Sequence, residues 1–100
     1  MQKPPSTTCT RVFEVFGDRW ILRIVDVLRD EPLRFGALQK RLDINTATLT
    51  VKLKQLEGLG LVERLEEFCD KQSVAYTLTP RGIELIPIID QILSFSSKLQ

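Results

Sequence analysis

Residues 35–57, with the sequence FGALQKRLDINTATLTVKLKQLE, combine two short helical patterns with a tight turn between them. The first pattern covers residues 35–42 and the second residues 46–57, and Asn45 is a good N-cap for the second helix. Apolar residues recur every three or four positions, at Phe35, Leu38 and Leu42 in the first pattern and at Leu49, Leu53 and Leu56 in the second. Two short helices joined by about three residues are the signature of a helix-turn-helix.

The second of these helices is predicted to present its exposed face to duplex DNA. Small polar side chains near its start suit base edges and phosphates, and the major groove admits one helix of this width. The exposed face consists of Thr46, Ala47, Thr48, Thr50, Val51, Lys52, Lys54 and Gln55. The candidate base or phosphate contacts on it are Thr46, Thr48 and Thr50, although the Thr50 hydroxyl could equally hydrogen-bond to its own helix backbone.

Positive charge is concentrated on the same stretch of chain. Between Arg34 and Lys54 there are five basic residues against Asp43 alone, a balance of +4 in a protein whose formal net charge is +1. Basic side chains on helices usually form no more than a solvated surface. It is their coincidence with the helix-turn-helix pattern that favours binding to nucleic acid.

A β-hairpin is predicted directly after the helix-turn-helix, in the position of a wing. Residues 61–68 and 74–78 alternate apolar and polar side chains in the manner of strands. Thr79 and Pro80 then begin a last helix, because Thr is a good N-cap and Pro fits the first helical position. Pro87 should kink this helix or divide it in two. The expected fold is mainly α with a small β-hairpin.

Two further helices are predicted before the helix-turn-helix. Gly17 ends or bends a short first helix, and Asp18 caps a second helix that stops at Pro32. Residues 1–8 are polar and Pro-rich, and we expect them to form a flexible N-terminal arm. Residues 9–100 are expected to form a single domain that ends in a C-terminal dimerisation helix.

The composition disfavours enzymes, metal sites and membrane proteins. The chain has 100 residues, two cysteines and no histidine. Ser-His and Cys-His pairs therefore cannot exist, and two thiols cannot supply the four ligands of a structural zinc site. Neither a signal-peptide pattern nor an apolar run of about 18 residues is present. We expect a cytoplasmic protein with no cofactor, no metal and no membrane partner.

Five short motifs, taken in order, resemble the HxlR-type transcriptional regulators. They are Gly17-Asp18-Arg19-Trp20; Arg34-Phe35 with Leu38; Leu49-Thr50 with Lys52-Leu53-Lys54 and Leu56; Gly60-Leu61-Val62-Glu63-Arg64; and Tyr76-Thr77-Leu78-Thr79-Pro80 with Gly82. Each motif is weak alone, but five in this order and at this spacing are specific. The resemblance implies a winged helix-turn-helix fold, a homodimer formed by the terminal helices, and regulation of transcription by binding to a palindromic operator in double-stranded DNA.

The resemblance also implies roles for single residues. Arg34 would be free to reach a phosphate, and Lys52 and Lys54 occupy the basic positions of the recognition helix. Trp20 would be a core residue, and Tyr76 would pack the wing against the body. The complete predicted DNA-binding set is Arg34, Thr46, Thr48, Thr50, Lys52, Lys54, Gln55 and Lys71.

The sequence departs from the family pattern in two places. The family often carries a Cys-Pro near the N-terminus, and in some members that thiol senses oxidants or electrophiles. Here Thr7 aligns with that position and Cys9 follows two residues later, beside Arg11. Cys9 is either a redox-sensing thiolate at a helix start or a packing thiol in the dimer interface. The wing from Glu63 to Lys71 has four acids against two bases, so it is expected to add little affinity for DNA beyond Lys71 and Ser73.

Alternatives to a DNA-binding regulator remain open from the sequence. A winged-helix protein-interaction module that no longer binds DNA would suit the near-neutral net charge and the acidic wing. An enzyme is disfavoured, because the chain lacks histidine, a metal cluster and a Gly-rich phosphate loop. An unknown small-molecule or electrophile effector would be expected near the dimer interface, although no residue points to one.

Overall fold

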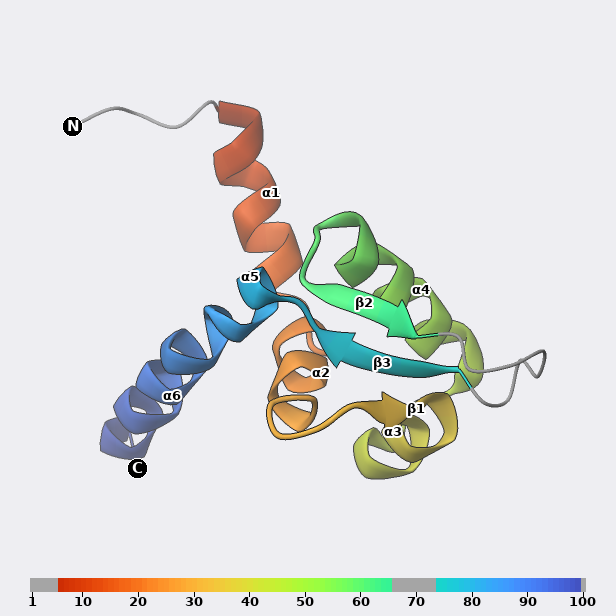
Figure 1. Ribbon diagram of the computed structural model, residues 1–100. Helices are drawn as coiled ribbons and strands as arrows, with labels where there is room; N and C mark the ends of the chain where they lie inside the picture. Colours follow the sequence, from red (N-terminus) through yellow and green to blue (C-terminus); the bar gives the residue numbers. More distant parts are fainter. Residues whose placement is uncertain (1–5, 66–73, 100) are drawn as a thin grey trace.

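The computed structural model describes residues 6–65 and 74–99 of the chain. Along the chain the elements are α1 (Ser6–Phe16), α2 (Ile21–Val27), β1 (Leu33–Arg34), α3 (Phe35–Leu42), α4 (Thr46–Gly58), β2 (Val62–Leu65), β3 (Ala75–Leu78), α5 (Pro80–Ile83), α6 (Leu85–Ser96) and the 3-10 turn η2 (Ser97–Leu99). In Figure 1, α1 and α6 extend away from the body on one side, while the sheet and the helices α3 and α4 occupy the other. The fold is mainly α with a small sheet, as the sequence predicted.

The sheet contains one strand more than the predicted hairpin. Its three strands are antiparallel and lie in the order β1-β3-β2. On the central strand β3, Tyr76 lies between Leu33 of β1 and Arg64 of β2. Strand β1 is only two residues long, and two residues cannot show the alternation by which a strand is predicted. Tyr76 is buried, in agreement with its predicted packing role.

The core lies between α2, α3, α4 and the sheet, and it is entirely apolar among the described side chains. The leucine stripe predicted for the second helix of the motif, Leu49, Leu53 and Leu56, is at most 1% exposed. Complete burial of a leucine side chain stabilises a fold by about 1.5–3 kcal/mol. This stripe fixes which face of α4 points inward, and therefore which face is left for a ligand.

The turn between α3 and α4 follows the prediction closely. Asp43 adopts the left-handed conformation, with a φ of 52°, and so ends α3. The Asn45 side chain then accepts a hydrogen bond from the N–H of Thr48 at 2.8 Å, as an N-cap does. After α4, Gly60 reverses the chain with a φ of 74°, a conformation that glycine adopts without steric cost.

Two helix starts differ from the prediction. α1 begins at Ser6, so residues 6–8 of the predicted arm are helical, while the division into an arm and one domain stays a prediction. α2 begins at Ile21, later than expected. Asp18 Oδ2 still accepts the N–H of Trp20 at 2.8 Å, so its carboxylate caps the turn that leads into the helix.

The last helical region divides in two, as Pro87 indicated. α5 begins with Pro80 after the Thr79 cap, whose hydroxyl accepts the N–H of Gly82 at 3.1 Å. The division falls at Glu84, between α5 and α6. In a continuous helix Pro87 would have to bond to the carbonyl four residues earlier, but it has no N–H and its ring would collide with that carbonyl. α6 therefore leaves the body as a separate segment.

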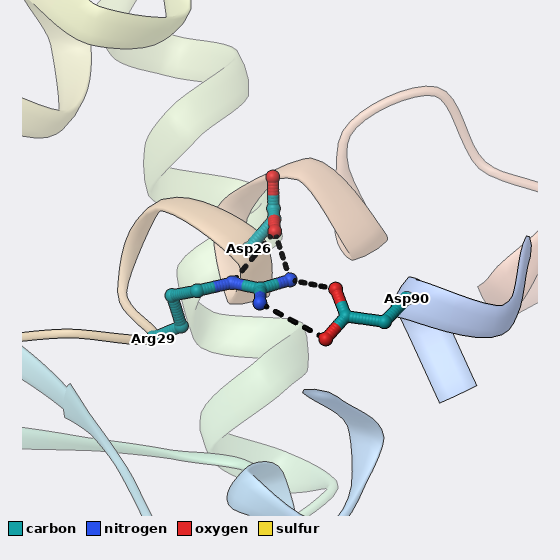
Figure 2. Close-up of polar contacts among 3 residues, drawn as sticks. All are labelled: Asp26, Arg29 and Asp90. Carbon is teal, nitrogen blue, oxygen red and sulfur yellow. Dashed lines mark hydrogen bonds and ion pairs between the residues drawn. The ribbon is translucent and has the colours of Figure 1, made fainter. Parts of the chain in front are cut away.

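An arginine at the end of α2 connects α6 to the body (Figure 2). The Arg29 guanidinium lies between the carboxylates of Asp26 and Asp90, with Nη2 at 2.6 Å from Asp26 Oδ1 and at 2.7 Å from Asp90 Oδ1. Its Nη1 donates to the second Asp90 oxygen at 3.2 Å, so the Arg29–Asp90 pair is bidentate. Ile89, next to Asp90, is the buried residue of α6. The ion pair and this buried side chain hold α6 against the body, and Leu85 and Ile86 of the same helix also pack against the core.

Candidate nucleic-acid interface

The outward face of α4 follows directly from the burial of its leucine stripe. Positions four and seven residues apart lie on the same side of a helix, and Ala47, Val51 and Lys54 share the side opposite the leucines. All three side chains are exposed, and Val51 is 60% exposed. A ligand that approaches α4 from the side opposite the leucines would contact these three residues.

The predicted threonines hydrogen-bond within the protein. The Thr46 hydroxyl accepts a hydrogen bond from Gln39 Nε2 at 2.8 Å, which joins α3 to α4. The Thr50 hydroxyl donates to the Thr46 carbonyl at 2.7 Å, the backbone bond that the sequence left open as an alternative. Thr48 is half-buried at the N-cap turn. As DNA contacts, Thr46, Thr48 and Thr50 stay predictions.

The two predicted lysines of α4 differ sharply in their surroundings. Lys52 Nζ lies 2.7 Å from Asp18 Oδ1, and both side chains are 21% exposed. Lys54 is exposed and makes no ion pair with residues 6–65 or 74–99. Lys52 therefore holds the turn before α2 against α4, whereas Lys54 points its charge to solvent. Their roles toward DNA stay predictions.

The Asp18–Lys52 ion pair has a measurable electrostatic signature. Partial burial alone would raise the pKa of Asp18. The hydrogen bond from Lys52, the backbone N–H of Trp20 and the charge of Lys52 together outweigh burial, and the pKa lies below its ordinary value. Asp18 is thus an ionised carboxylate that links two elements of the DNA-binding body, a role that the capping prediction from sequence did not include.

The remaining basic side chains near the helix-turn-helix are mostly exposed. Lys40 has no ion-pair partner in the described part of the chain, and Arg41 lies 3.8 Å from Glu31 in a pair whose two side chains are both exposed. Such a pair holds its arginine weakly. Arg34 is exposed on the edge strand β1, where it has a contact of its own. As a phosphate contact, Arg34 stays a prediction.

A cluster of two arginines around Trp20 was not anticipated. Trp20 is half-buried against the core, in keeping with its predicted packing role. The guanidinium carbons of Arg19 and Arg23 lie 4.8 and 4.9 Å from the centre of its ring, which is cation–π distance. Arg19 follows Asp18 directly, so this positive surface adjoins the Asp18–Lys52 pair. The sequence did contain a signal for this cluster, because Arg19 and Arg23 lie one position before and three positions after Trp20 and would share its side of a helix.

Gln55 lies on another side of α4. It lines a groove of about 580 Å³ between α1 and the end of α4, together with residues that include Val12, Phe16 and Leu59. The N-terminal half of α4 is away from this groove. Cys9 belongs to α1, and Lys71 lies outside the described residues. The predictions for Gln55, Cys9 and Lys71 therefore stay predictions.

The described residues contain neither a metal-binding cluster nor a membrane-spanning helix. Within residues 6–65 and 74–99, no group of three or more His, Cys, Asp or Glu side chains is placed to hold a metal ion. None of the helices in these ranges is both long enough and apolar enough to span a bilayer.

A helix-turn-helix with a free outward face on its second helix, followed by an antiparallel wing, defines a class of DNA-binding proteins. The sequence profile of the HxlR-like helix-turn-helix family matches residues 15–100. The chain belongs to this family. Like other HxlR-like proteins, it is a DNA-binding transcriptional regulator with a winged-helix fold.

Named relatives of this HxlR-like chain are regulators too. An uncharacterized HTH-type transcriptional regulator of Halalkalibacterium halodurans is 34% identical over 88 residues, which cover 86% of this chain and 78% of that protein. A Mycobacterium tuberculosis regulator is 32% identical over 88% of this chain, but the match spans only 56% of that longer protein. YodB of Bacillus subtilis is 30% identical over 97 residues, 93% of this chain and 87% of YodB.

Solved structures of YodB share the fold. The reduced form has a TM-score of 0.81 to this chain at 29% identity, covering 98% of this chain and 94% of that one. A quinone-bound form has a TM-score of 0.77 at 30% identity, covering 92% of this chain and 98% of that one. The HxlR-like fold and the class of function therefore rest on agreement between the sequence profile, the relatives and the structures.

Proposed function

We propose that this HxlR-like regulator works in the cytoplasm as a homodimer, and that its two copies of α4 bind the two half-sites of a palindromic operator. It acts by binding double-stranded DNA and not by catalysis. Recognition helices of such a dimer enter the major groove one helical turn apart, about 34–36 Å between centres. Lys54 and the other exposed cations near α4 supply contacts to phosphates.

The observation that carries the dimer is the exposed apolar surface of the terminal helices. Phe13 on α1 is 80% exposed and Phe95 on α6 is 59% exposed, although large apolar patches on a lone monomer are uncommon. The other large apolar side chains exposed on these two helices are Val12, Ile88, Ile92 and Leu93. A second copy of the chain would cover this surface and leave the N-terminal half of α4 free, since that half lies away from α1 and α6 (Figure 1).

Titration against duplex DNA tests the proposal. The pure protein is mixed with a fluorescent duplex from upstream of its own gene, at several salt concentrations and with scrambled competitor, and anisotropy is recorded. We expect tight binding that resists the competitor and weakens by orders of magnitude between low and moderate salt. A folded dimer that binds no duplex even at low salt would overturn the proposal in favour of a protein-interaction module.

A single substitution on α1 tests the dimer. Phe13→Glu places a charge within the exposed apolar surface, so the variant should sediment as a monomer at micromolar concentration and bind operator DNA weakly. Phe13→Tyr keeps the ring and is the matched control, which should remain dimeric. If the Phe13→Glu protein stays dimeric, the dimer interface does not include this part of α1.

A redox response through Cys9 is a second candidate. Cys9 lies on α1, the helix that carries part of the proposed dimer surface, and the relative YodB has been solved with quinone bound. We propose that an electrophile acting on Cys9 releases the operator. Diamide or a quinone should then weaken operator binding by the wild type but not by Cys9→Ser. If the wild type is equally insensitive, redox sensing is excluded.

A further inference from the structure

We propose that Ala47 and Val51 form an apolar strip on α4 that recognises the 5-methyl groups of thymines in each half-site of the operator. The inference rests on the proposed function, because it requires α4 to enter the major groove. It adds the chemical group that is read there and the residues that read it.

Val51 is exposed without any explanation in the packing of the protein. It is 60% exposed in the middle of α4. The other large apolar side chains exposed among the described residues lie on α1, α5, α6 and η2 or just after α4, at Leu59. Valine is also a weaker helix former than most residues found on helix surfaces. Neither the core nor helix stability accounts for a valine at this position.

The neighbours of Val51 on α4 strengthen the case for an apolar contact. Ala47 lies one turn earlier on the same side of the helix and is also exposed. The hydroxyls of Thr46 and Thr50, which flank this side, already hydrogen-bond within the protein. The centre of the outward face, formed by Ala47 and Val51, presents methyl groups and not hydrogen-bonding groups.

The positive charge around the strip favours DNA as its ligand over a protein surface that carries no negative charge. Lys54 continues the line from Val51 by one turn and carries an exposed positive charge. From Ile44 to Leu56 the chain has no acidic residue. An apolar strip bordered by a lysine, on a helix without acids over that stretch, matches a ligand that combines methyl groups with phosphates.

Thymine is the base that presents such a methyl group in the major groove, and alanine-sized side chains contact it there. The Cβ atoms of residues four apart on a helix are about 5–6 Å apart, whereas successive base pairs are separated by about 3.4 Å. Ala47 and Val51 therefore span between one and two base steps. The two thymines they read should lie on adjacent or next-adjacent base pairs of each half-site.

Removing single methyl groups from the DNA tests whether the strip recognises thymine. An operator is first selected from random duplexes with the wild-type protein, and each thymine in a half-site is then replaced by deoxyuridine. This change removes the methyl group and keeps every base-pairing hydrogen bond. We expect two positions per half-site to lose affinity by about fourfold each, the factor that corresponds to burial of one methyl-sized group.

Protein variants assign the effect to the strip. In Val51→Ala, one of the two deoxyuridine positions should lose most of its effect, because alanine lacks the two γ-methyl groups with which Val51 would cover the thymine methyl. Comparing both proteins on both operators separates this pairwise contact from changes in DNA flexibility. Ala is a good helix former, so this variant should fold. Lys54→Ala is the matched control, and it should weaken binding to the thymine and deoxyuridine operators by the same factor.

Three outcomes overturn the inference in different ways. If the operator binds and every deoxyuridine substitution leaves affinity unchanged, the strip does not read thymine, while the proposed function stands. If the folded protein selects no duplex at low salt, the proposed function itself fails and the inference with it. If deoxyuridine weakens binding equally in wild type and Val51→Ala, another residue contacts the methyl group and the assignment to Val51 is wrong.

Discussion

Lys52 and Lys54 show how two identical residues two positions apart acquire different roles. Lys52 is bound to Asp18 at 2.7 Å, and Lys54 is exposed without an ion pair in the described chain. Asp18 precedes Lys52 by 34 residues, so no local pattern in the sequence reveals the pairing. A basic position on a recognition helix is thus either a contact for DNA or a link within the protein, and the packing of the turn before α2 decides which.

Substitution of the two lysines separates these roles. Lys54→Ala should weaken binding to all duplexes and reduce the slope of log affinity against log salt by about one. Lys52→Ala should also weaken binding, but it leaves the half-buried Asp18 carboxylate without its partner and should in addition lower thermal stability. Affinity is measured by anisotropy and stability by calorimetry. If both substitutions together leave DNA affinity unchanged, the assignment of α4 as recognition helix is wrong.

The lowered pKa of Asp18 predicts a pH dependence of stability. An unfolded aspartate titrates near a pKa of about 3.9. Since the pKa is lower in the folded protein, the pair stabilises the fold at pH above the unfolded value, and this contribution is lost as pH falls through the folded value. Asp18→Asn should therefore be less stable than wild type at neutral pH, and the difference should shrink below pH about 4.

Urea unfolding at a series of pH values measures this difference. In a Lys52→Ala background the effect of Asp18→Asn should show a weaker pH dependence, because the hydrogen bond and the charge of Lys52, two of the contributions that lower the Asp18 pKa, are gone. A stability difference that stays constant from neutral to acid pH would show that the ion pair contributes nothing.

At the scale of elements, the sequence predicted those features that depend on residues close together in the chain. The Asn45 and Thr79 caps, the leucine stripe of α4 and the division of the last helix near Pro87 all depend on residues within about one turn of each other, and each was predicted. Strand β1 was missed, because it exists only through its pairing with β3. The connection of α6 to α2 by Arg29 and Asp90 joins residues 61 apart and has no local signal.

The junction between β2 and α5 depends on one glycine. A Cβ built on Gly82 would collide with the backbone carbonyl of Leu61, and a backbone atom cannot move aside cheaply. Gly82→Ala should destabilise the protein by about 1–3 kcal/mol, the usual cost of overpacking. Gly36→Ala, on α3 with nothing near its Cβ, is the matched control and should be neutral or stabilising. Equal melting temperatures for the two variants would contradict this account.

At the scale of the whole molecule, the DNA-binding surface and the apolar terminal helices are at different ends. Five motifs spread over the chain were enough to predict the family and the fold, because they mark turns, caps and core positions that every member needs. They were not enough to predict which side chains on the exposed face of α4 are already engaged within the protein. That depends on contacts with other parts of the chain, such as the hydrogen bond from Gln39 to Thr46 and the ion pair between Asp18 and Lys52.

The exposed apolar surface of α1 and α6 also predicts how stability depends on concentration. If a second copy covers Phe13 and Phe95, association stabilises the folded state by mass action. The melting temperature should then rise with protein concentration over a roughly hundredfold range, and the rise should disappear in Phe13→Glu. A melting temperature that is the same at all concentrations for the wild type would contradict the proposed dimer.

The Arg29–Asp90 ion pair is partly exposed to solvent, so dissolved ions screen it, as they screen contacts to a DNA backbone. Screening weakens both interactions over the same range of ionic strength. As a cell loses water under osmotic stress, its ions concentrate. The proposed phosphate contacts of α4 then weaken, and so does the ion pair that joins α6 to the body. Occupancy of the operator should accordingly fall more steeply in a shrinking cell than the number of phosphate contacts alone would suggest.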